Sequence, residues 1–545
     1  MKNRSGRGRS HRTRLALRLA MALAVAAPLA VAGGTATAAS PAAAPAGAAA
    51  TAGTAAAHWT TQHVAPGVQV RTGTLTDTAG APSWTVTVQA PVEAAFTGRP
   101  AWAEVGGTTW ASGTTAKLRT AGFTPVETPV PWPRYSDTPH GLMGVRIRIG
   151  SYPTQQAAQN TASLVTAAGF HTAVEWTGYD ADQPADVEHV RVAVIDPGTF
   201  TGSVEGTHDG NVAQRETTSS VAAELGSLVG VNGGFFITSD ADGAQGLQAG
   251  LAAYDGRVQS LASGARAALV LGDGGRHNRI ADLTTTATAR IGDSRYAVHG
   301  VNRTPGLVRD CGQPGGSPTA RPRQDLTCTE QDDLVAFTPE YRHALPAGAG
   351  TQVVVDARGR IVSVGSRGGD VTAGHTVLQG IGSAAAWLTG HAVVGAKATV
   401  RTAISDSRGR PVVLGPHDSV VSAAPTLVAD GRIHIDAAAE GTVDPSDLSF
   451  GYAWANTRQP RTMAGIDGRG RLLLVTVDGR LSGGSEGFTL AEGAAFMRSL
   501  GAVEALNLDG GGSTAMAVGG RLVTHPSDAT GERAVGDTVQ VLPRD

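Results

Sequence analysis

The sequence predicts an α+β protein in which a small ferredoxin-like βαββαβ module precedes a β-rich mixed domain. Three observations lead to this fold class. The 545 residues include 73 glycines and are 41% hydrophobic, as expected for a turn-rich globular protein. A strand–helix–strand pattern occurs twice before residue 180. Beyond residue 186, short runs of Val, Ile and Leu alternate with Gly, Asp-Gly and Asn turns almost to the C-terminus.

Residues 1–39 have the pattern of a secretory signal peptide. A basic head precedes an apolar run from about Leu15 to Ala32, and Ala36-Thr37-Ala38 fits a small-x-small cleavage site. An uncleaved membrane anchor is the alternative, since the run is close to spanning length. Residues 40–57 form an Ala/Pro-rich linker of low complexity. We therefore expect a secreted, extracellular protein with no membrane partner after cleavage, and leave association with the cell wall open.

Charge and cysteine content narrow the function further. Loss of the seven basic residues in the leader changes the net charge from −2 to about −9, which argues against nucleic acid as a partner. Cys311 and Cys328 are expected to form one disulfide in an exported protein. A catalytic thiol is the competing interpretation.

Residues 58–185 are predicted to form the ferredoxin-like module. Trp84 to Val88 and Gly144 to Ile149 alternate as strands do. Each is followed by a helix-like stretch ending in Ala-Gly-Phe, at residues 121–123 and 168–170. The glycine in each stretch can end a helix, and a further extended run follows. This order is typical of a split βαβ sandwich.

Residues 186–545 are predicted to be one catalytic domain. Strands are expected at residues 353–356, 360–364 and 472–477, where β-branched residues recur between turn formers. Helices are few. The best candidate runs from Thr489 to Leu500, with apolar residues at helical spacing and Gly501 to end it.

The segment from Asn507 to Thr514 is the clearest candidate for chemistry. Polar residues alternate with leucine over residues 505–509, so Asn507 and Asp509 are expected on one face of a strand. Three glycines then expose backbone N–H groups, and a carboxylate beside such donors suits sugar or phosphate chemistry. Ala515 replaces the last glycine that a nucleophile elbow needs, and no lysine follows the glycines as in a Walker loop.

Two further segments add candidate ligands. The paired glycines of residues 232–236 (Asn-Gly-Gly-Phe-Phe) allow close approach of a ligand, and the phenylalanines could form a platform for a sugar; a plain Asn-Gly turn is the alternative. Residues 460–487 are a β-hairpin by their turn signals, but arginine there suits bidentate phosphate recognition. The polar residues of this second segment are Arg461, Thr462, Asp478, Arg480 and Ser485.

Taken together, these motifs resemble the phosphodiester glycosidase family. The matching segments follow the family's order: residues 232–236, residues 424–428 with Asp430-Gly431, Arg461-Thr462 with residues 478–480, residues 507–513, and residues 526–528 with residues 531–533. The insertion from Arg309 to Cys328 departs from the family pattern and could reshape the substrate rim. The stretch 145–170 resembles the sporulation-related repeat (SPOR-like) domain, whose members bind peptidoglycan strands; a structural appendage is the alternative.

The resemblance implies hydrolysis of a sugar C1–O–phosphate bond, with phosphate left on the acceptor. Asp509 would act as base, nucleophile or oxocarbenium stabiliser, with Asp478 and Glu532 as reserve carboxylates or mere turn and salt-bridge residues. Arg461 and Arg480 would clamp phosphate, while Asn232 and Asn507 would orient sugar groups. The other substrate-binding candidates are Gly233, Gly234, Phe235, Thr462, Ser485, Gly510, Gly511, Ser513, Thr514 and Arg533.

The expected partners are a phosphate-linked glycan of the cell envelope or the extracellular space, and peptidoglycan through the SPOR-like module. No cofactor and no metal ligand set is expected, and a structural cation is left open. Two other functions compete. A metal-dependent phosphodiesterase would cleave the P–O bond, but the histidines lack His-x-x-x-His spacing within these motifs. A non-catalytic, peptidoglycan-binding envelope protein is the second.

Overall fold

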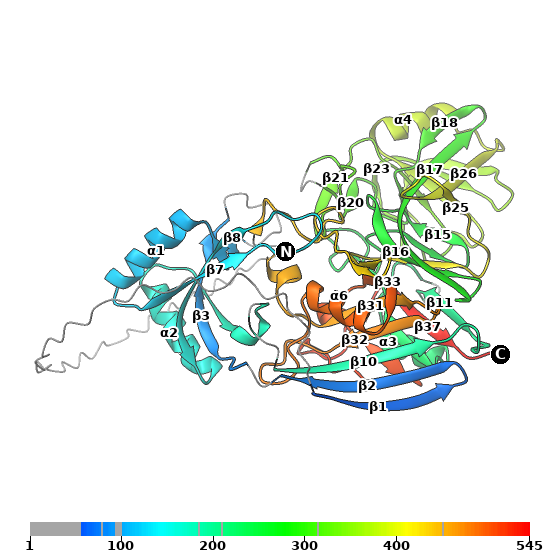
Figure 1. Ribbon diagram of the computed structural model, residues 1–545. Coiled ribbons are helices and arrows are strands. Elements are labelled where there is room, and N and C mark those ends of the chain that lie inside the picture. Colours follow the sequence, from blue (N-terminus) through cyan, green and yellow to red (C-terminus); the bar gives the residue numbers. More distant parts are fainter. Residues whose placement is uncertain are drawn as a thin grey trace, which may run out of the picture. The chain divides into compact units, whose positions relative to one another are not determined.

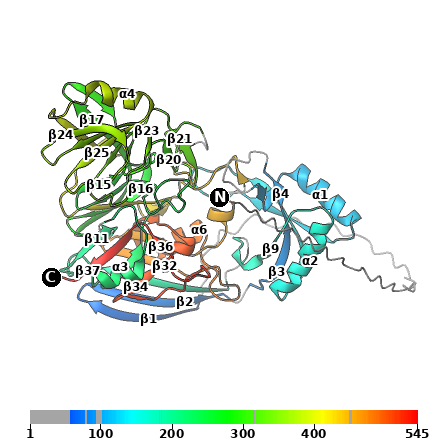
Figure 2. The same ribbon diagram turned by 180° about the vertical axis from the view of Figure 1, so that it is seen from behind.

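The computed structural model describes residues 56–77, 80–92, 101–181, 183, 186–208, 211–312, 316–448 and 452–544. The predicted signal peptide and nearly all of the predicted linker lie outside the described residues. Within the described part, no helix is long and apolar enough to cross a membrane. Figure 1 labels the elements, and Figure 2 shows them from behind.

A sheet of eight antiparallel strands forms the base of the larger domain. Its order is β1 (Ala56–Ala65), β2 (Val68–Thr76), β10 (Val187–Ile195), β32 (Leu472–Val477), β31 (Arg461–Asp467), β33 (Ala502–Asn507), β29 (Thr426–Ala429) and β30 (Arg432–Ile433). Every residue of β31 and β32 is buried, because both faces of the sheet are covered. The strand predicted at residues 472–477 is confirmed.

One face of this sheet packs against α6 (Leu490–Ser499), which Figure 1 shows in orange beside β31 and β33. Thr489 and Glu492 form a capping box at its start, and Gly501 follows its end with a φ of +92°. The predicted helix is therefore confirmed.

The other face packs against a second sheet of five strands. Leu474 and Leu506 from the first sheet share a core cluster there with Val231 and Val539. The order is β11 (Ser203–Thr207), β37 (Thr538–Leu542), β13 (Val229–Asn232), β34 (Met516–Val518) and β35 (Arg521–Leu522). Helix α3 (Thr218–Glu224) and the ribbon of β12 (Glu216–Thr217) and β36 (Ala534–Val535) complete this layer.

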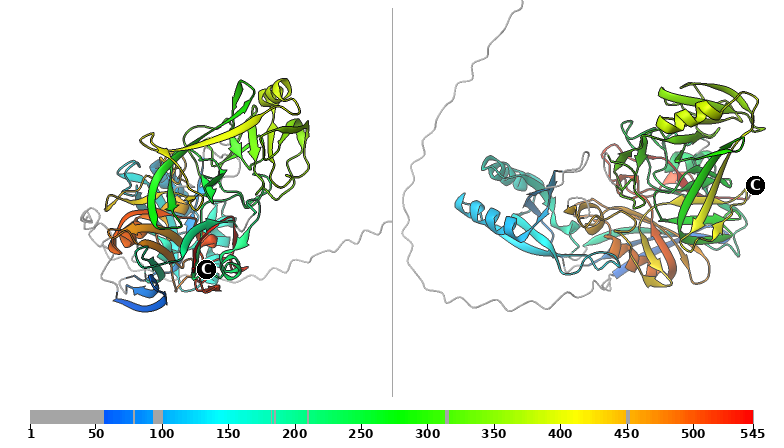
Figure 3. Two further views of the ribbon diagram at one scale, coloured as in Figure 1. Left: turned by 90° about the vertical axis from the view of Figure 1, so that its right-hand side faces the viewer. Right: turned by 90° about the horizontal axis from the view of Figure 1, so that it is seen from above.

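Two more sheets lie toward the middle of the chain, in green and yellow in Figure 3. The first contains β15 (Arg257–Ser260), β14 (Ala252–Tyr254), β28 (Ser419–Ser422), β16 (Arg266–Gly272), β17 (His277–Ile291), β26 (Ala398–Asp406), β27 (Pro411–Val412) and β18 (Ser294–Ala297). The second contains β19 (Gly300–Val301), β22 (Leu334–Phe337), β25 (Thr376–Gly380), β23 (Gly348–Val355) and β24 (Ile361–Arg367), with α4 (Gly382–His391) packed on it. The last two strands confirm the predictions at residues 353–356 and 360–364.

The insertion after Arg309 forms a loop closed by a disulfide. Its ends pair as β20 (Leu307–Arg309) and β21 (Thr327–Thr329), and the sulfurs of Cys311 and Cys328 are bonded. The predicted disulfide is therefore present, and the described residues include no free cysteine.

The N-terminal module has the element order βαββαβ. Its strands are β3 (Trp84–Val88), β7 (Pro125–Pro131), β8 (Leu142–Tyr152) and β9 (Thr172–Trp176), with α1 (Thr108–Thr120) and α2 (Gln155–Ala167) between them. They pair antiparallel in the order β9-β3-β8-β7. Both helices pack on one face of this sheet. The short strands β4 (Ala90–Pro91), β5 (Trp102–Ala103) and β6 (Val105–Gly106) flank it. Membership of the SPOR-like family stays a prediction.

Residues 58–76 fold differently from the sequence-based division. They form β1 and β2, which belong to the large sheet rather than to the module, because Val68 and Val70 bury their side chains with Ala193 and Ile195. Thr76 at the end of β2 pairs directly with Val187 at the start of β10. The module is thus inserted between two neighbouring strands of the large sheet.

Candidate active site

The candidate site lies at one end of the large sheet. Arg461 opens β31 and pairs with Val477, the last residue of β32. Asn507, the last residue of β33, pairs with Met463. Because neighbouring strands are antiparallel, the start of β31 and the ends of β32 and β33 lie at the same end of the sheet. The segments that carry Arg461, Arg480 and Asp509 therefore lie there together.

Asn232 fixes the backbone at this edge. Its Nδ2 donates to the carbonyl of Asp509 at 2.8 Å, and its Oδ1 accepts from Thr462 Oγ1 at 2.6 Å and from the amide of Ala515 at 3.0 Å. The amide of Asp509 donates to Gly233 O at 3.0 Å. Asn232 is fully buried. The structure thus gives Asn232 and Thr462 a positioning role, whereas the sequence suggested a sugar contact for Asn232.

Asp509 has the carboxylate best placed for chemistry. Leu506 and Leu508 both enter the core, so the strand alternation continues past β33 and turns Asp509 away from it. The side chain is partly exposed, and one oxygen accepts the amide of Gly510 at 2.8 Å. Burial raises the pKa of Asp509 to about 7, against the opposing effects of the Gly510 amide hydrogen bond and the Arg533 charge.

The glycines after Asp509 leave room for two arginines. A Cβ on Gly511 would lie 3.1 Å from Arg480 Nη2, and one on Gly512 would overlap the guanidinium of Arg533. Arg533 in turn forms a bidentate ion pair with Asp528, at 2.7 and 3.0 Å. Asp528 was not selected from the sequence, although it lies in a matching segment. The glycine loop therefore brings one carboxylate and two guanidinium groups together.

Arg480 is the exposed cation of this group. Its Nε donates to Gln459 Oε1 at 2.7 Å, and its backbone has a left-handed φ of +60°. Although the residue is exposed, the surrounding groups partly desolvate its guanidinium, and this desolvation and the nearby charge of Arg533 both lower the pKa of Arg480. Arg480 and Arg533 are neighbouring cations, and the charge of Arg533 is partly compensated by Asp528. The two guanidinium groups therefore form a suitable subsite for an anion.

Arg461 does not share that position. It is 1% exposed, its Nε donates to Phe488 O at 2.8 Å, and its Nη2 donates to Trp454 O at 2.6 Å. Its guanidinium also stacks 4.8 Å from the Trp454 ring, and burial lowers its pKa to about 10. Arg461 thus lies beneath the surface, where it braces η2 (Tyr452–Asn456), and its part in a phosphate clamp stays a prediction.

The reserve carboxylates are held in structural contacts. Asp478 is buried, pairs with Arg191 at 2.7 Å and accepts the amide of His525 at 3.0 Å. Ser485 Oγ donates to Asp478 O at 2.7 Å. Glu532 accepts the amide of Ser219 at 2.9 Å and so caps the start of α3. These contacts fit the alternative interpretation of the two acids as salt-bridge and cap residues.

The Phe235–Phe236 pair is not a surface platform. Both side chains are 6% exposed, and the ring of Phe235 packs edge-on to Trp454 at 6.0 Å. Asn507 is also buried, and its Nδ2 donates to Ala424 O at 3.0 Å. Its Oδ1 and the Oγ1 of Thr514 have no hydrogen-bond partner among the described residues. Together with Ser513 Oγ, three buried polar atoms of the described residues thus remain unsatisfied in the segment around Asp509.

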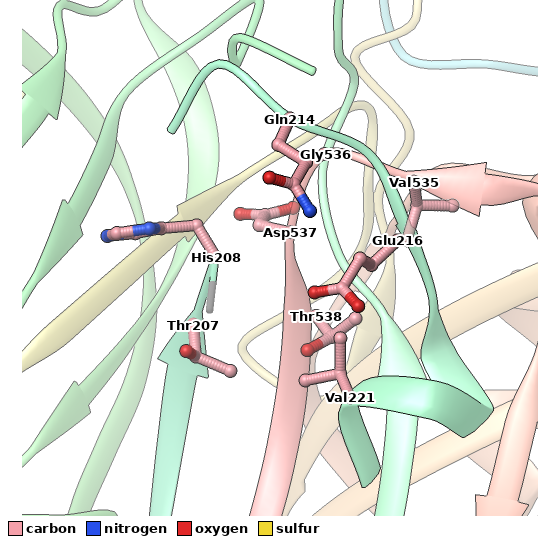
Figure 4. Close-up of a pocket in the computed structure, with 9 residues that line it drawn as sticks. All are labelled: Thr207, His208, Gln214, Glu216, Val221, Val535, Gly536, Asp537 and Thr538. Atoms are coloured by element: carbon pink, nitrogen blue, oxygen red, sulfur yellow. The ribbon is translucent and has the colours of Figure 1, made fainter. Parts of the chain in front are cut away.

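Sequence reasoning missed Asp537, which supports the Gly233–Gly234 turn. Its Oδ1 accepts the amide of Gly234 at 2.9 Å, its Oδ2 accepts Tyr254 OH at 2.7 Å, and burial raises its pKa to about 6. Figure 4 shows Asp537 in a small cavity with Gln214 and Glu216 around it. No local pattern marks Asp537, because its role depends on a strand far away in the chain.

The disulfide-closed loop reaches the same site. Arg309 Nη2 pairs with Asp325 Oδ1 at 2.8 Å, and Thr327 Oγ1 donates to Asp242 Oδ1 at 2.6 Å. The charge of Asp325 is close enough to add to the raised pKa of Asp509. This loop therefore belongs to the rim of the site. Across the described part of the chain, no cluster of three His, Cys, Asp or Glu side chains could hold a metal ion.

Comparison with known proteins finds matches to part of the chain. A family model described as "Phosphodiester glycosidase" matches residues 349–542. The N-acetylglucosamine-1-phosphodiester alpha-N-acetylglucosaminidase of Mus musculus is 32% identical over 116 residues, which are 21% of this chain and 22% of the mouse enzyme. Its counterpart in Bos taurus is 36% identical over 114 residues, 21% of each protein. The chain thus matches about a fifth of the length of these curated relatives.

A solved structure covers far more of the chain. It is that of a "Putative exported protein" from Burkholderia pseudomallei, with 32% sequence identity and a TM-score of 0.76 over 90% of this chain and 97% of that one. The family match includes Asp509, Arg480 and Arg533, while Asn232 lies before it and is joined to it by the fold. Residues 349–542 belong to the phosphodiester glycosidase family.

Proposed function

We propose that this protein is a secreted hydrolase that cleaves a sugar C1–O–phosphate bond in a cell-envelope or extracellular glycan and leaves phosphate on the acceptor. The observation that carries the proposal is the position of Asp509 beside Arg480 and Arg533 over a glycine loop. The family match and the names of the curated relatives support the same chemistry.

Each of these groups has a part in the proposed reaction. Phosphate is a weakly basic leaving group, so its charge needs stabilisation more than a proton. The exposed guanidinium of Arg480, with the guanidinium of Arg533 close by, supplies that stabilisation. Asp509 in its ionised form assists attack at C1, either as base to water or as nucleophile. The C1–O bond then breaks, and its electron pair stays on the phosphate oxygen.

The test is hydrolysis of a panel of sugar-1-phosphate diesters in oxygen-18 water. Cleavage at C1 leaves the released phosphate monoester without label, whereas cleavage at phosphorus labels it. The phosphate is the deciding product because the anomeric oxygen of a free sugar exchanges with water. Labelled phosphate would show cleavage at phosphorus, as expected of a phosphodiesterase, and would overturn the proposal. The absence of hydrolysis across the panel would also overturn it.

A further inference from the structure

The conformation of Arg480 requires support from its surroundings. A left-handed φ of +60° is costly for a residue with a Cβ, and such strain persists where neighbouring contacts impose it. Its amide donates to Glu486 O at 3.4 Å, and the amide of Leu481 donates to Ser485 O at 3.1 Å. Residues 480–486 thus form a tight loop whose shape sets the direction of the Arg480 side chain.

The N-terminal module holds this loop from one side. Val190 of β10 pairs with Val477, so the strand that follows the module starts at the edge where the loop begins. Tyr179 OH, in the short helix η1 (Thr177–Tyr179), is 3.0 Å from Ser482 Oγ. Trp176 Nε1 donates to Glu486 Oε1 at 3.0 Å. Gly178 packs so closely on Glu486 that a Cβ there would overlap its carboxylate.

A second connection runs from the module to Arg480 through Arg458 and Gln459. The buried guanidinium of Arg458 donates to three backbone carbonyls of the module's last segment, those of Gly178 at 2.7 Å, Asp180 at 2.9 Å and Gln183 at 2.6 Å. The next residue, Gln459, accepts the Nε of Arg480. The same short segment of the module therefore fixes both the backbone loop and the side-chain partner of Arg480.

We infer that residues 176–181 and Gln183 of the N-terminal module are positioning residues for Arg480, so that the module completes the anion subsite of the larger domain. This inference rests on the proposed function, because it takes the Arg480 guanidinium as the phosphate-binding group. The ligand class is a phosphate monoester or diester, recognised by two guanidinium groups.

The test uses the full chain and inorganic phosphate as the probe. We expect Trp176→Phe/Tyr179→Phe, which removes two hydrogen-bonding groups and keeps an aromatic side chain at both positions, to weaken phosphate binding about 3- to 10-fold in calorimetric titration. KM for a diester substrate should rise by a similar factor, with a smaller change in kcat. Trp102→Phe/Tyr152→Phe is the matched control in the same module and should leave both values unchanged. Ser482→Ala removes the Tyr179 bond from the loop side and should reproduce part of the effect.

The Arg480→Met variant distinguishes a failure of the proposed anion subsite from a failure of the inference about the module. If Arg480→Met loses phosphate binding while the Trp176→Phe/Tyr179→Phe and Ser482→Ala variants keep wild-type affinity, the module does not position Arg480 and the inference is wrong. If Arg480→Met itself keeps wild-type phosphate affinity, the proposed anion subsite is wrong and the inference falls with it. Thermal unfolding of each variant shows whether the loss of affinity is separate from a loss of folding.

Discussion

At the residue scale, Asp509 combines a fixed backbone with partial exposure. Its backbone is fixed by Asn232 and Gly233, while the residue as a whole stays partly exposed. A fixed carboxylate with a pKa of about 7 is ionised in about half of the molecules near neutral pH. Such a group can take up a proton in one step and release it in the next.

We expect Asp509→Asn to lower kcat by about 10²–10⁴-fold, the usual contribution of a positioned acid or base. Asparagine keeps the size of the side chain, so the loop should stay folded, which circular dichroism will show. Asp430→Asn is the control and should keep full activity, because Asp430 is exposed in a turn at the end of β29 that lies away from Asn507. Full turnover by a folded Asp509→Asn protein would remove Asp509 from the mechanism.

The raised pKa of Asp509 also makes a prediction about stability. The folded-state pKa of about 7 lies above the ordinary value of 3.8, so the stability that this difference contributes is fully present below pH 3.8 and is lost as the pH rises through 7. The Tm of Asp509→Asn should therefore gain on that of the wild type between pH 4 and pH 8. Parallel Tm curves across this range would contradict the assigned pKa.

At the scale of elements, the glycine loop and the disulfide-closed loop meet around one carboxylate. The first brings Arg480 and Arg533 close by omitting side chains, and the second adds the negative charge of Asp325. Burial sets the raised pKa of Asp509, and the charges of Arg533 and Asp325 shift it down and up respectively. A change in either loop should therefore alter the reaction without touching the carboxylate.

Gly512→Ala should lower kcat/KM by up to about 10²-fold, because the new methyl group displaces Arg533 from its pair with Asp528. Steady-state kinetics with a sugar-1-phosphate diester measures the loss. Gly113→Ala in α1, where a methyl group meets open space, is the matched control. Equal activity of the two variants would show that the Arg533–Asp528 pair plays no part in catalysis.

Asp325→Asn should move the pH profile of kcat/KM to lower pH. Loss of this negative charge lowers the pKa of Asp509, so the ionised form is reached at lower pH. Asparagine tolerates the left-handed φ of +62° at this position. Asp293→Asn, at a fully exposed side chain, serves as the control. An unchanged profile would mean that Asp325 does not act on Asp509 in solution.

At the scale of the whole molecule, the Cys311–Cys328 disulfide restrains an insertion that carries part of the site rim. The two cysteines are 17 residues apart in sequence, and closing a loop of this size contributes about 3 kcal/mol to the free energy of unfolding. Cys311→Ser/Cys328→Ser should lose roughly that amount in guanidinium unfolding. Reducing agent should lower the free energy of unfolding of the wild type to the value of this double variant. The double variant itself should not respond to reducing agent and serves as the reference.

The features that could be predicted from the sequence are those that depend on residues close together in the chain. The helix at residues 490–499 and the strand at 472–477 could be predicted because their periodicity is local. The pairing of β2 with β10 could not, since each strand meets a partner on the other side of the module. At the site, Asp509 and Arg480 stand in recognisable motifs. The buried role of Arg461 and the helix cap formed by Glu532 depend on what the fold places beside them.

The insertion of the module between β2 and β10 has a practical consequence for protein engineering. Thr76 and Val187 are paired, and the amide of Asp77 donates to Asp186 O at 3.0 Å, so the two ends of the module leave the sheet side by side. Excision of residues 78–185 and a two-residue turn in their place would therefore join β2 and β10 as a continuous hairpin. Truncation of the chain before residue 186 would instead strip β1 and β2 from the sheet and leave β10 as a bare edge prone to aggregation.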